Sequence, residues 1–206
     1  MSPRRYTLLS DGSSDRILLR VIDWLLDVNT PMLFRGEWAD LGRLPQPPRT
    51  LADRIRRALD LYPCDLLFVH RDAENQPRQV RVTEVQSALA DLGEPPPAVL
   101  VVPVRMTEAW FLFDAGAIRV ASGNPHSAAR LDLPALQDVE RLSDPKAVLH
   151  HLLEQASGRS GRKLRTFRGD VAVHRLAECI DDFASLRVLP AFAAFEKDVL
   201  DILPAL

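Results

Sequence analysis

Short apolar runs alternate with longer amphipathic segments along the first half of the chain. The runs have the length and composition of buried strands, and the amphipathic segments repeat apolar side chains every three or four positions, as one face of a helix does. The strand-like segments are residues 6–9, 32–38, 65–69 and 98–104. The helix-like segments are residues 15–28, 51–61 and 78–92. This alternation predicts an α/β fold, in which a mostly parallel sheet with right-handed crossovers is covered by helices on both faces.

The second half of the chain has no strong strand candidate. An apolar helix is expected directly after Thr107, and Asp144 followed by Pro145 is typical of a helix start. Further helices are expected at residues 147–155, 171–186 and 190–203. We therefore expect an α/β core over residues 1–114 and a helical C-terminal extension over residues 115–206 that packs on the core as one structural unit.

Polar residues gather where the predicted strands end. Ligands of an open parallel sheet bind outside the carboxyl ends of its strands, where loops from different strands converge. The chemistry-bearing side chains at those ends are Asp11, Asp15, His70, Asp72, Glu74, Arg105 and Glu108. Carboxylates gathered at one edge repel one another unless they share a cation, and oxygen ligands suit Mg²⁺ or Mn²⁺. Each acid alone also fits a helix cap or a polar loop, but together they predict a metal site.

Two short motifs at these strand ends resemble those of the Toprim superfamily. Residues 11–15 read Asp-Gly-Ser-Ser-Asp, and the first Toprim motif reads Glu-Gly-x-[Ser/Thr]-[Asp/Glu] between the first strand and the first helix. Residues 70–74 read His-Arg-Asp-Ala-Glu and resemble the Asp-x-Asp-x-Glu motif after the third strand. Toprim members include primases, topoisomerases, RNase M5-like nucleases and the overcoming-lysogenization-defect nucleases. The resemblance implies a Toprim or Rossmann-like core.

A group of bacterial Toprim-like proteins, often placed beside ATPases in phage-defence settings, shares more of the pattern. Its members carry a Pro-x-x-x-x-Glu-x-Trp stretch like residues 103–110, a Pro-Lys helix start like residues 145–146, and a helical C-terminal region. The resemblance implies metal-dependent cleavage of phosphodiester bonds in DNA or RNA. It also implies a separate ATPase as a partner, and a homo-oligomer is compatible with it.

The resemblance assigns roles to individual residues. It gives Asp11, Asp72 and Glu74 the role of metal ligands, while Asp11, Asp15 or His70 would transfer the proton. Glu108 would complete the acidic cluster, although a carboxylate in the first turn of a helix is an equally good description of it. The chain departs from the superfamily pattern at Asp11, which is shorter than the usual Glu, and at His70, which replaces the first Asp of the second motif. Imidazole is a better ligand for Mn²⁺ than for Mg²⁺.

Positive charge for binding a nucleic acid is concentrated in a few places. Guanidinium groups bind phosphate oxygens in bidentate fashion. A segment over residues 157–168 is basic, contains two glycines and no acid, and fits either a nucleic-acid contact or a solvated loop. The candidates are Arg71, Arg105, Arg159, Arg162, Lys163 and Arg165.

Absent motifs narrow the function. There is no phosphate-binding loop of the Gly-x-x-x-x-Gly-Lys-[Ser/Thr] type and no Gly-x-Ser-x-Gly nucleophile elbow. The tyrosines, Tyr6 and Tyr62, are poorly placed for a topoisomerase nucleophile. Two alternatives to a nuclease stay open: a non-catalytic or trans-activated subunit of a separate ATPase, and a phosphatase-like enzyme with Asp72 as nucleophile, whose motif the sequence fits poorly.

Composition is that of an ordinary globular protein. The 206 residues are 47% hydrophobic and 26% charged, and the net charge of -2 excludes a strongly basic nucleic-acid coat. The charge is uneven, because residues 61–157 carry 8 basic and 13 acidic side chains. Cys64 and Cys179 have no metal or redox spacing, and no apolar run is long enough for a signal peptide or a membrane span. We expect a cytoplasmic protein with reduced, buried thiols.

Overall fold

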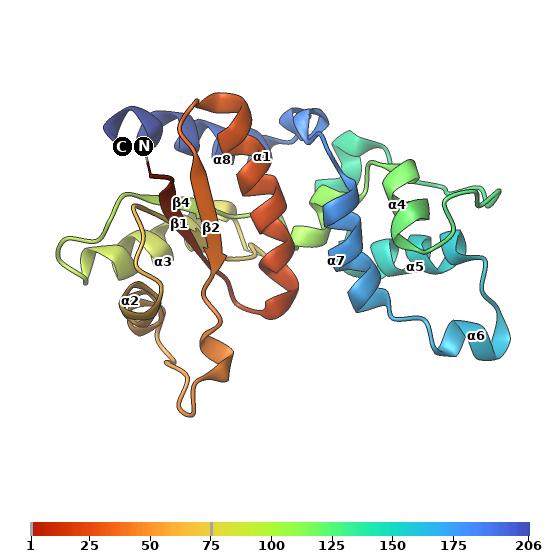
Figure 1. Cartoon of the computed structure of the whole chain (residues 1–206), viewed down its shortest axis with the longest axis horizontal. Coiled ribbons are helices and arrows are strands. Elements are labelled where there is room, and N and C mark those ends of the chain that lie inside the picture. Colours follow the sequence, from red (N-terminus) through yellow and green to blue (C-terminus); the bar gives the residue numbers. More distant parts are fainter. Residues whose placement is uncertain (1, 75) are drawn as a thin grey trace.

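A four-stranded parallel sheet forms the centre of the protein, and a lobe of helices extends from one side of it (Figure 1). The computed structural model describes residues 2–74 and 76–206. The strands are β1 (Arg4–Leu9), β2 (Phe34–Trp38), β3 (Leu66–His70) and β4 (Ala98–Val101), in the order β2-β1-β3-β4. Every neighbouring pair is parallel. The predicted Rossmann-like α/β fold with a helical C-terminal part is confirmed.

Strand β3 runs through the middle of the core, and all five of its residues are buried. Side chains alternate along it, so that Phe68 packs in one hydrophobic cluster and Leu67 and Val69 pack in a second cluster on the other face. Each helix that packs on the sheet contributes to one of these two clusters. The first face is covered by α1 (Leu18–Asn29) and α8 (Pro190–Ile202), and the second by α2 (Leu51–Leu61) and α3 (Arg78–Ala90).

The helical lobe continues the first of these clusters beyond the sheet. Its helices are α4 (Ala115–Ala121), α5 (Pro145–Ser157), α6 (Gly161–Arg165) and α7 (Gly169–Cys179). The chain then returns to the sheet, where Phe195 of α8 meets Phe68 edge to face and stacks on Trp110. Figure 1 shows the two chain ends side by side, and Arg4 donates a hydrogen bond to the carbonyl of Leu206.

Short 3₁₀ helices join many of the main elements. They are Ser13–Ile17, Leu41–Arg43, Thr107–Phe111, Leu136–Arg141, Ala184–Val188 and Leu203–Ala205. The apolar helix expected after Thr107 is present as a 3₁₀ helix that ends at Phe111. The helix predicted over residues 171–186 ends at Cys179, since Ile180 and Phe183 turn into the core. Strand β4 ends at Val101, shortly before Pro103, which has no N–H to donate to a ladder.

Two further sequence predictions concern the cysteines and the membrane. Cys64 and Cys179 form no disulfide, and both are half-buried rather than buried. Within residues 2–74 and 76–206, none of the helices has the length and apolar character needed to cross a bilayer.

Candidate metal centre

The candidate site lies at the carboxyl ends of β1 and β3, which are neighbours in the sheet. The helix that follows β1 covers one face of the sheet, and the helix that follows β3 covers the other. A crevice opens where such connections diverge, and it is the usual ligand position in an open α/β sheet. The polar loops after Leu9 and His70 therefore meet at the position where a ligand is expected.

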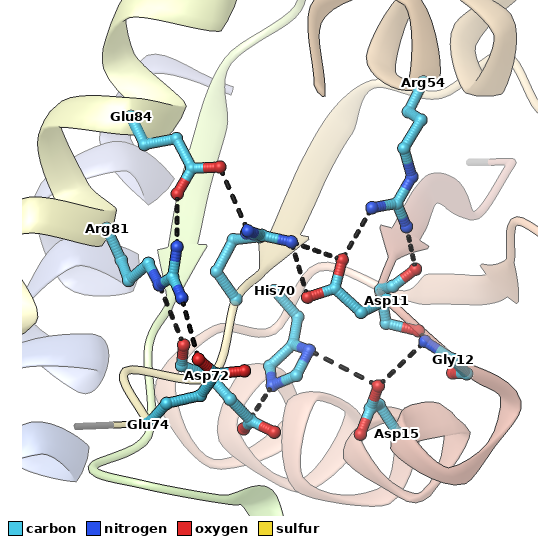
Figure 2. Close-up of polar contacts among 11 residues, drawn as sticks. Asp11, Gly12, Asp15, Arg54, His70, Asp72, Glu74, Arg81 and Glu84 are labelled. Atoms are coloured by element: carbon cyan, nitrogen blue, oxygen red, sulfur yellow. Dashed lines mark hydrogen bonds and ion pairs between the residues drawn. The ribbon is translucent and has the colours of Figure 1, made fainter. Parts of the chain in front are cut away.

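His70 is the last residue of β3, and its side chain has no exposed surface. Its Nε2 atom lies 3.1 Å from Asp72 Oδ1 and 3.0 Å from Thr107 Oγ1. Its Nδ1 atom lies 3.6 Å from Asp15 Oδ2, beyond hydrogen-bond distance, and has no hydrogen-bond partner among the residues described. The ring thus stands between two carboxylates, one from the β1 loop and one from the β3 loop (Figure 2).

Asp15 is turned inward by the 3₁₀ helix that follows β1. The backbone N–H of Gly12 donates to Asp15 Oδ2 over 3.1 Å, so the carboxylate closes the turn that carries it. Burial raises the pKa of Asp15 above its ordinary value, and the nearby charges of Asp72 and Glu108 add to this, while His70 opposes it. A buried carboxylate with a raised pKa is stabilised by a cation placed beside it.

The charge state of His70 follows from the same neighbours. Burial by itself lowers the pKa of an imidazole, but the hydrogen bond to Asp72 and the charges of Asp72, Asp15 and Asp11 outweigh it, and the net pKa is raised. The metal-free centre therefore favours an imidazolium that compensates the two carboxylates. A positive charge held at this position is what a metal cation would supply.

The donor set fits a metal ion. One ligand atom from each of Asp15, His70 and Asp72 can be chosen so that all three lie within 4.8 Å of one another. The unpartnered, fully buried Nδ1 of His70 is the second observation, because a buried nitrogen without a partner is costly unless a ligand satisfies it. A buried Asp-His-Asp group that can hold a metal ion is therefore present at the switch point of the sheet.

Asp11 belongs to the same loop but faces α2 instead of the centre. Its carboxylate accepts hydrogen bonds from Arg54 at 2.6 Å and from Arg71 at 2.6 and 2.7 Å. Burial would raise the pKa of Asp11, but the two guanidinium groups outweigh it and hold the pKa below its ordinary value. Asp11 was predicted as a metal ligand and as a proton-transfer group. Its oxygens are occupied by arginines, and it lies outside the Asp-His-Asp group.

Glu74 also lies outside that group. Its side chain is 66% exposed and forms an ion pair with Arg81 at 3.2 Å. Arg81 also binds Glu84 at 2.9 Å, and Glu84 binds Arg71 at 3.0 Å, so charges alternate from α2 to α3 (Figure 2). Of the predicted ligands Asp11, Asp72 and Glu74, only Asp72 joins the Asp-His-Asp group, and metal binding by the other two stays a prediction.

The loops after β3 and β4 are linked through unusual backbone geometry. Glu74 and Arg105 have φ angles of 53° and 62°, in the left-handed region that L-residues rarely adopt. The N–H of Glu74 donates to the carbonyl of Arg105 over 3.1 Å, which binds the two turns together. Such strain is often concentrated at functional sites. Arg105, a predicted nucleic-acid contact, stands in this constrained turn, two residues before Thr107, which contacts His70.

Glu108 connects the centre to the helical lobe. It is buried and forms an ion pair with Lys146 of α5 at 2.9 Å. Burial lowers the pKa of Lys146, but the hydrogen bond to Glu108 outweighs it and the net pKa is raised, with Asp15 and Asp72 contributing. Glu108 therefore lies near the centre, as its predicted role requires, although it holds a lysine.

The basic segment of the lobe lies apart from the centre. Arg159, Arg162, Lys163 and Arg165 are all exposed, in and around α6, and Figure 1 places α6 at the end of the lobe farthest from the sheet. Arg159 lies 5.4 Å from the ring centre of Phe167. Of the predicted nucleic-acid contacts, only Arg71 and Arg105 lie near the metal centre.

Several residues of the site were not singled out from the sequence. They are Arg54, Arg81, Glu84 and Thr107. The i, i+3 spacing of Arg81 and Glu84 on a predicted helix was the one local signal for any of them. Arg54 is 43 residues from Asp11, so only the fold reveals that pair.

The fold and the site define an α/β protein of Rossmann-like topology with a candidate metal centre of two aspartates and a histidine. No protein-family model, curated protein or solved structure matches the chain. The Toprim resemblance consequently rests on the sequence motifs alone.

Proposed function

We propose that this protein is a divalent-metal-dependent nuclease that cleaves phosphodiester bonds. The observation that carries the proposal is the buried His70 with an unpartnered nitrogen, placed between Asp15 and Asp72 at the switch point of a parallel sheet. The two motifs that resemble Toprim nucleases supply the loops that carry these three residues.

Asp15, His70 and Asp72 would hold the ion. A bound divalent ion would polarise a phosphate ester and neutralise charge that develops on its oxygens. The imidazole in the donor set favours Mn²⁺ over Mg²⁺. His70 must lose its proton to bind the ion, so metal affinity depends on pH.

Arg71 is the residue best placed to bind the phosphate of the substrate. It is anchored on both sides, by Asp11 and by Glu84 at 3.0 Å, and the loop that carries it also carries Asp72. The guanidinium is held in place by these carboxylates, so a phosphate that replaces one of them would bind it without a large loss of side-chain entropy. Asp11 keeps its carboxylate ionised beside this arginine and holds the guanidinium in place.

The first test is metal binding. We expect Mn²⁺ to bind the purified protein in calorimetric titrations, and we expect Asp72→Asn and His70→Gln to lose that binding. Glu94→Gln is the control, since Glu94 is an exposed acid outside the loops that form the site. Retention of Mn²⁺ binding by both centre variants would contradict the assignment of the site.

The second test is cleavage. Plasmid, single-stranded DNA and RNA are incubated with the protein in Mg²⁺ or Mn²⁺, beside Asp72→Ala. We expect metal-dependent cleavage that Asp72→Ala abolishes. Metal binding without cleavage of any substrate would contradict the nuclease proposal and favour the alternative, a non-catalytic subunit that acts with a separate ATPase.

A further inference from the structure

A pocket of about 420 Å³ opens beside the candidate metal centre, outside the carboxyl ends of β1 and β2. One wall is the loop of residues 10–13, which leads directly to Asp15 of the centre. The other walls are Trp38, at the end of β2, and the loop that follows it to Arg49. The sequence motifs and the proposed metal chemistry leave this pocket without a role.

The pocket contains a fixed aromatic side chain. Trp38 is half-buried, and its indole N–H donates to Ser10 Oγ over 2.9 Å. The hydroxyl of Ser10 in turn donates to the carbonyl of Gly12 over 2.9 Å. Pro47 and Pro48 provide apolar surface elsewhere in the lining. An indole held in place among apolar residues is a suitable surface for the face of a flat ring.

The same pocket has cations placed for a phosphate. Arg54 lines it and binds both Asp11 and the carbonyl of Ser10 at 2.6 Å. Arg49 is exposed and also lines it. Two acids also line the pocket: Asp40 forms an ion pair with Arg43 at 2.5 Å, and Asp11 is paired with Arg54 and with Arg71. Flat apolar surface in the pocket and guanidinium groups in its lining match a nucleotide.

We propose that this pocket binds one nucleotide of a single-stranded nucleic acid, with its base beside Trp38 and its phosphate toward Arg54. Pockets for small ligands measure about 300 to 1,000 Å³, so this one has room for a single nucleotide. A base inside a duplex is stacked and paired, and it can enter such a pocket only after it leaves the helix. Stacking on an aromatic side chain accepts any base, so the strand is recognised without a fixed sequence.

This inference deepens the proposed function, because the shared loop of residues 10–13 would place the next phosphate of the strand toward the metal centre. The substrate class is then single-stranded DNA or RNA. Nucleotide binding in the pocket itself needs neither Asp72 nor a metal ion, so the two proposals can fail separately.

Gly42 offers a clean way to block the pocket. It lines the pocket, and a Cβ added there meets only Asp40 Oδ1, at 3.6 Å, which is an ordinary contact. Gly42→Tyr therefore adds a ring at the pocket without straining the backbone, and Gly42→Ala is its matched control. Trp38→Leu removes the aromatic face, while Trp38→Phe keeps a smaller aromatic ring and loses the N–H donor.

The binding test uses adenosine 5′-monophosphate and ribose 5-phosphate in calorimetric titrations with EDTA present. We expect the nucleotide to bind at least about tenfold more tightly than the sugar phosphate, since stacking one base is worth that much or more. Gly42→Tyr and Trp38→Leu should lose at least tenfold of this affinity, while Gly42→Ala and Trp38→Phe should stay within about threefold of the wild type. Equal affinity for the two probes, or undiminished binding by Gly42→Tyr, would overturn the proposal.

A fluorescently labelled short oligonucleotide distinguishes a nucleic-acid strand from a free nucleotide. We expect the single strand to bind in anisotropy titrations more tightly than the same sequence in a duplex, with Gly42→Tyr weakening the single strand alone. Equal binding of the two forms would contradict the single-strand assignment. Asp72→Ala should bind the nucleotide with the affinity of the wild type. If the wild type binds the nucleotide but cleaves no substrate, the nuclease proposal is refuted and the assignment of the pocket stands.

Discussion

His70→Gln tests whether the buried imidazole carries a positive charge in the metal-free protein. Burial lowers the pKa of His70, but the hydrogen bond and charge of Asp72 and the charge of Asp15 raise it further than burial lowers it. A histidine whose pKa is higher in the folded than in the unfolded state adds stability that is fully present below the unfolded pKa of about 6.5. That stability is lost as the pH rises through the folded pKa.

The size of this pH dependence is set by the single proton that His70 binds. The free energy of unfolding of the wild type should fall above about pH 6.5 with a slope of at most about 1.4 kcal/mol per pH unit from this group. Asp15 also has a raised pKa, chiefly from burial, and its contribution is lost over a window that begins lower, near about pH 4. The difference between wild type and His70→Gln therefore reports the imidazole together with its coupling to Asp15.

The assay is urea denaturation followed by circular dichroism, in EDTA, from mildly acid to mildly alkaline pH. His126→Gln is the control, because His126 is exposed and lies outside the site. The affinity of the protein for Mn²⁺ should show the opposite trend and increase as the pH rises. The ion binds the neutral imidazole, so its binding releases a proton. If wild type and His70→Gln have the same pH slope, the imidazolium between the two carboxylates does not exist.

Two further predictions concern packing and the junction of sheet and lobe. Gly36→Ala places a Cβ 2.2 Å from the Tyr6 ring, which is fully buried, so it should lower the free energy of unfolding by about 1 to 3 kcal/mol. Gly42→Ala, whose Cβ makes only an ordinary contact with Asp40 Oδ1 at 3.6 Å, should change the free energy of unfolding by less than about 0.5 kcal/mol in the same urea titration, and equal effects would refute the packing argument. Lys146→Met leaves the buried carboxylate of Glu108 without its partner at 2.9 Å and should cost about 1 to 3 kcal/mol. Adding Glu108→Gln should recover part of that loss, and a purely additive double variant would show that the pair is not coupled.

The elements of the core were predictable because their signals are local. The apolar run before His70 and the periodicity of residues 51–61 predicted β3 and α2 within one residue of their observed ends. The 3₁₀ turn at Thr107–Phe111 was not predictable in the same way, since its apolar residues fit either kind of helix. The early end of α7 depends on Ile180 and Phe183, whose burial in the core outweighs the local periodicity.

The sequence predicted where the candidate site lies in the fold, but not which of the acidic residues form it. Strand ends indicated the edge at which His70 and Asp72 lie. Which acid of the first loop faces inward depends on the turn between them, and that turn directs Asp15 to the centre and Asp11 toward Arg54. Glu74 has a left-handed backbone conformation, which glutamate rarely adopts, so the sequence did not predict that its side chain lies outside the centre.

The position of α8 has a consequence for the order in which the molecule can assemble. The face of the sheet that contains Phe68 is completed by Phe195, and Trp110 packs against the same helix. During synthesis the part of this face that α8 covers stays open until residues 190–202 have left the ribosome, because the residues of the lobe precede them in the chain. Incomplete chains would expose a broad apolar surface and be prone to aggregation. The sheet and the lobe are thus expected to reach their native packing together, in a late and cooperative step of folding.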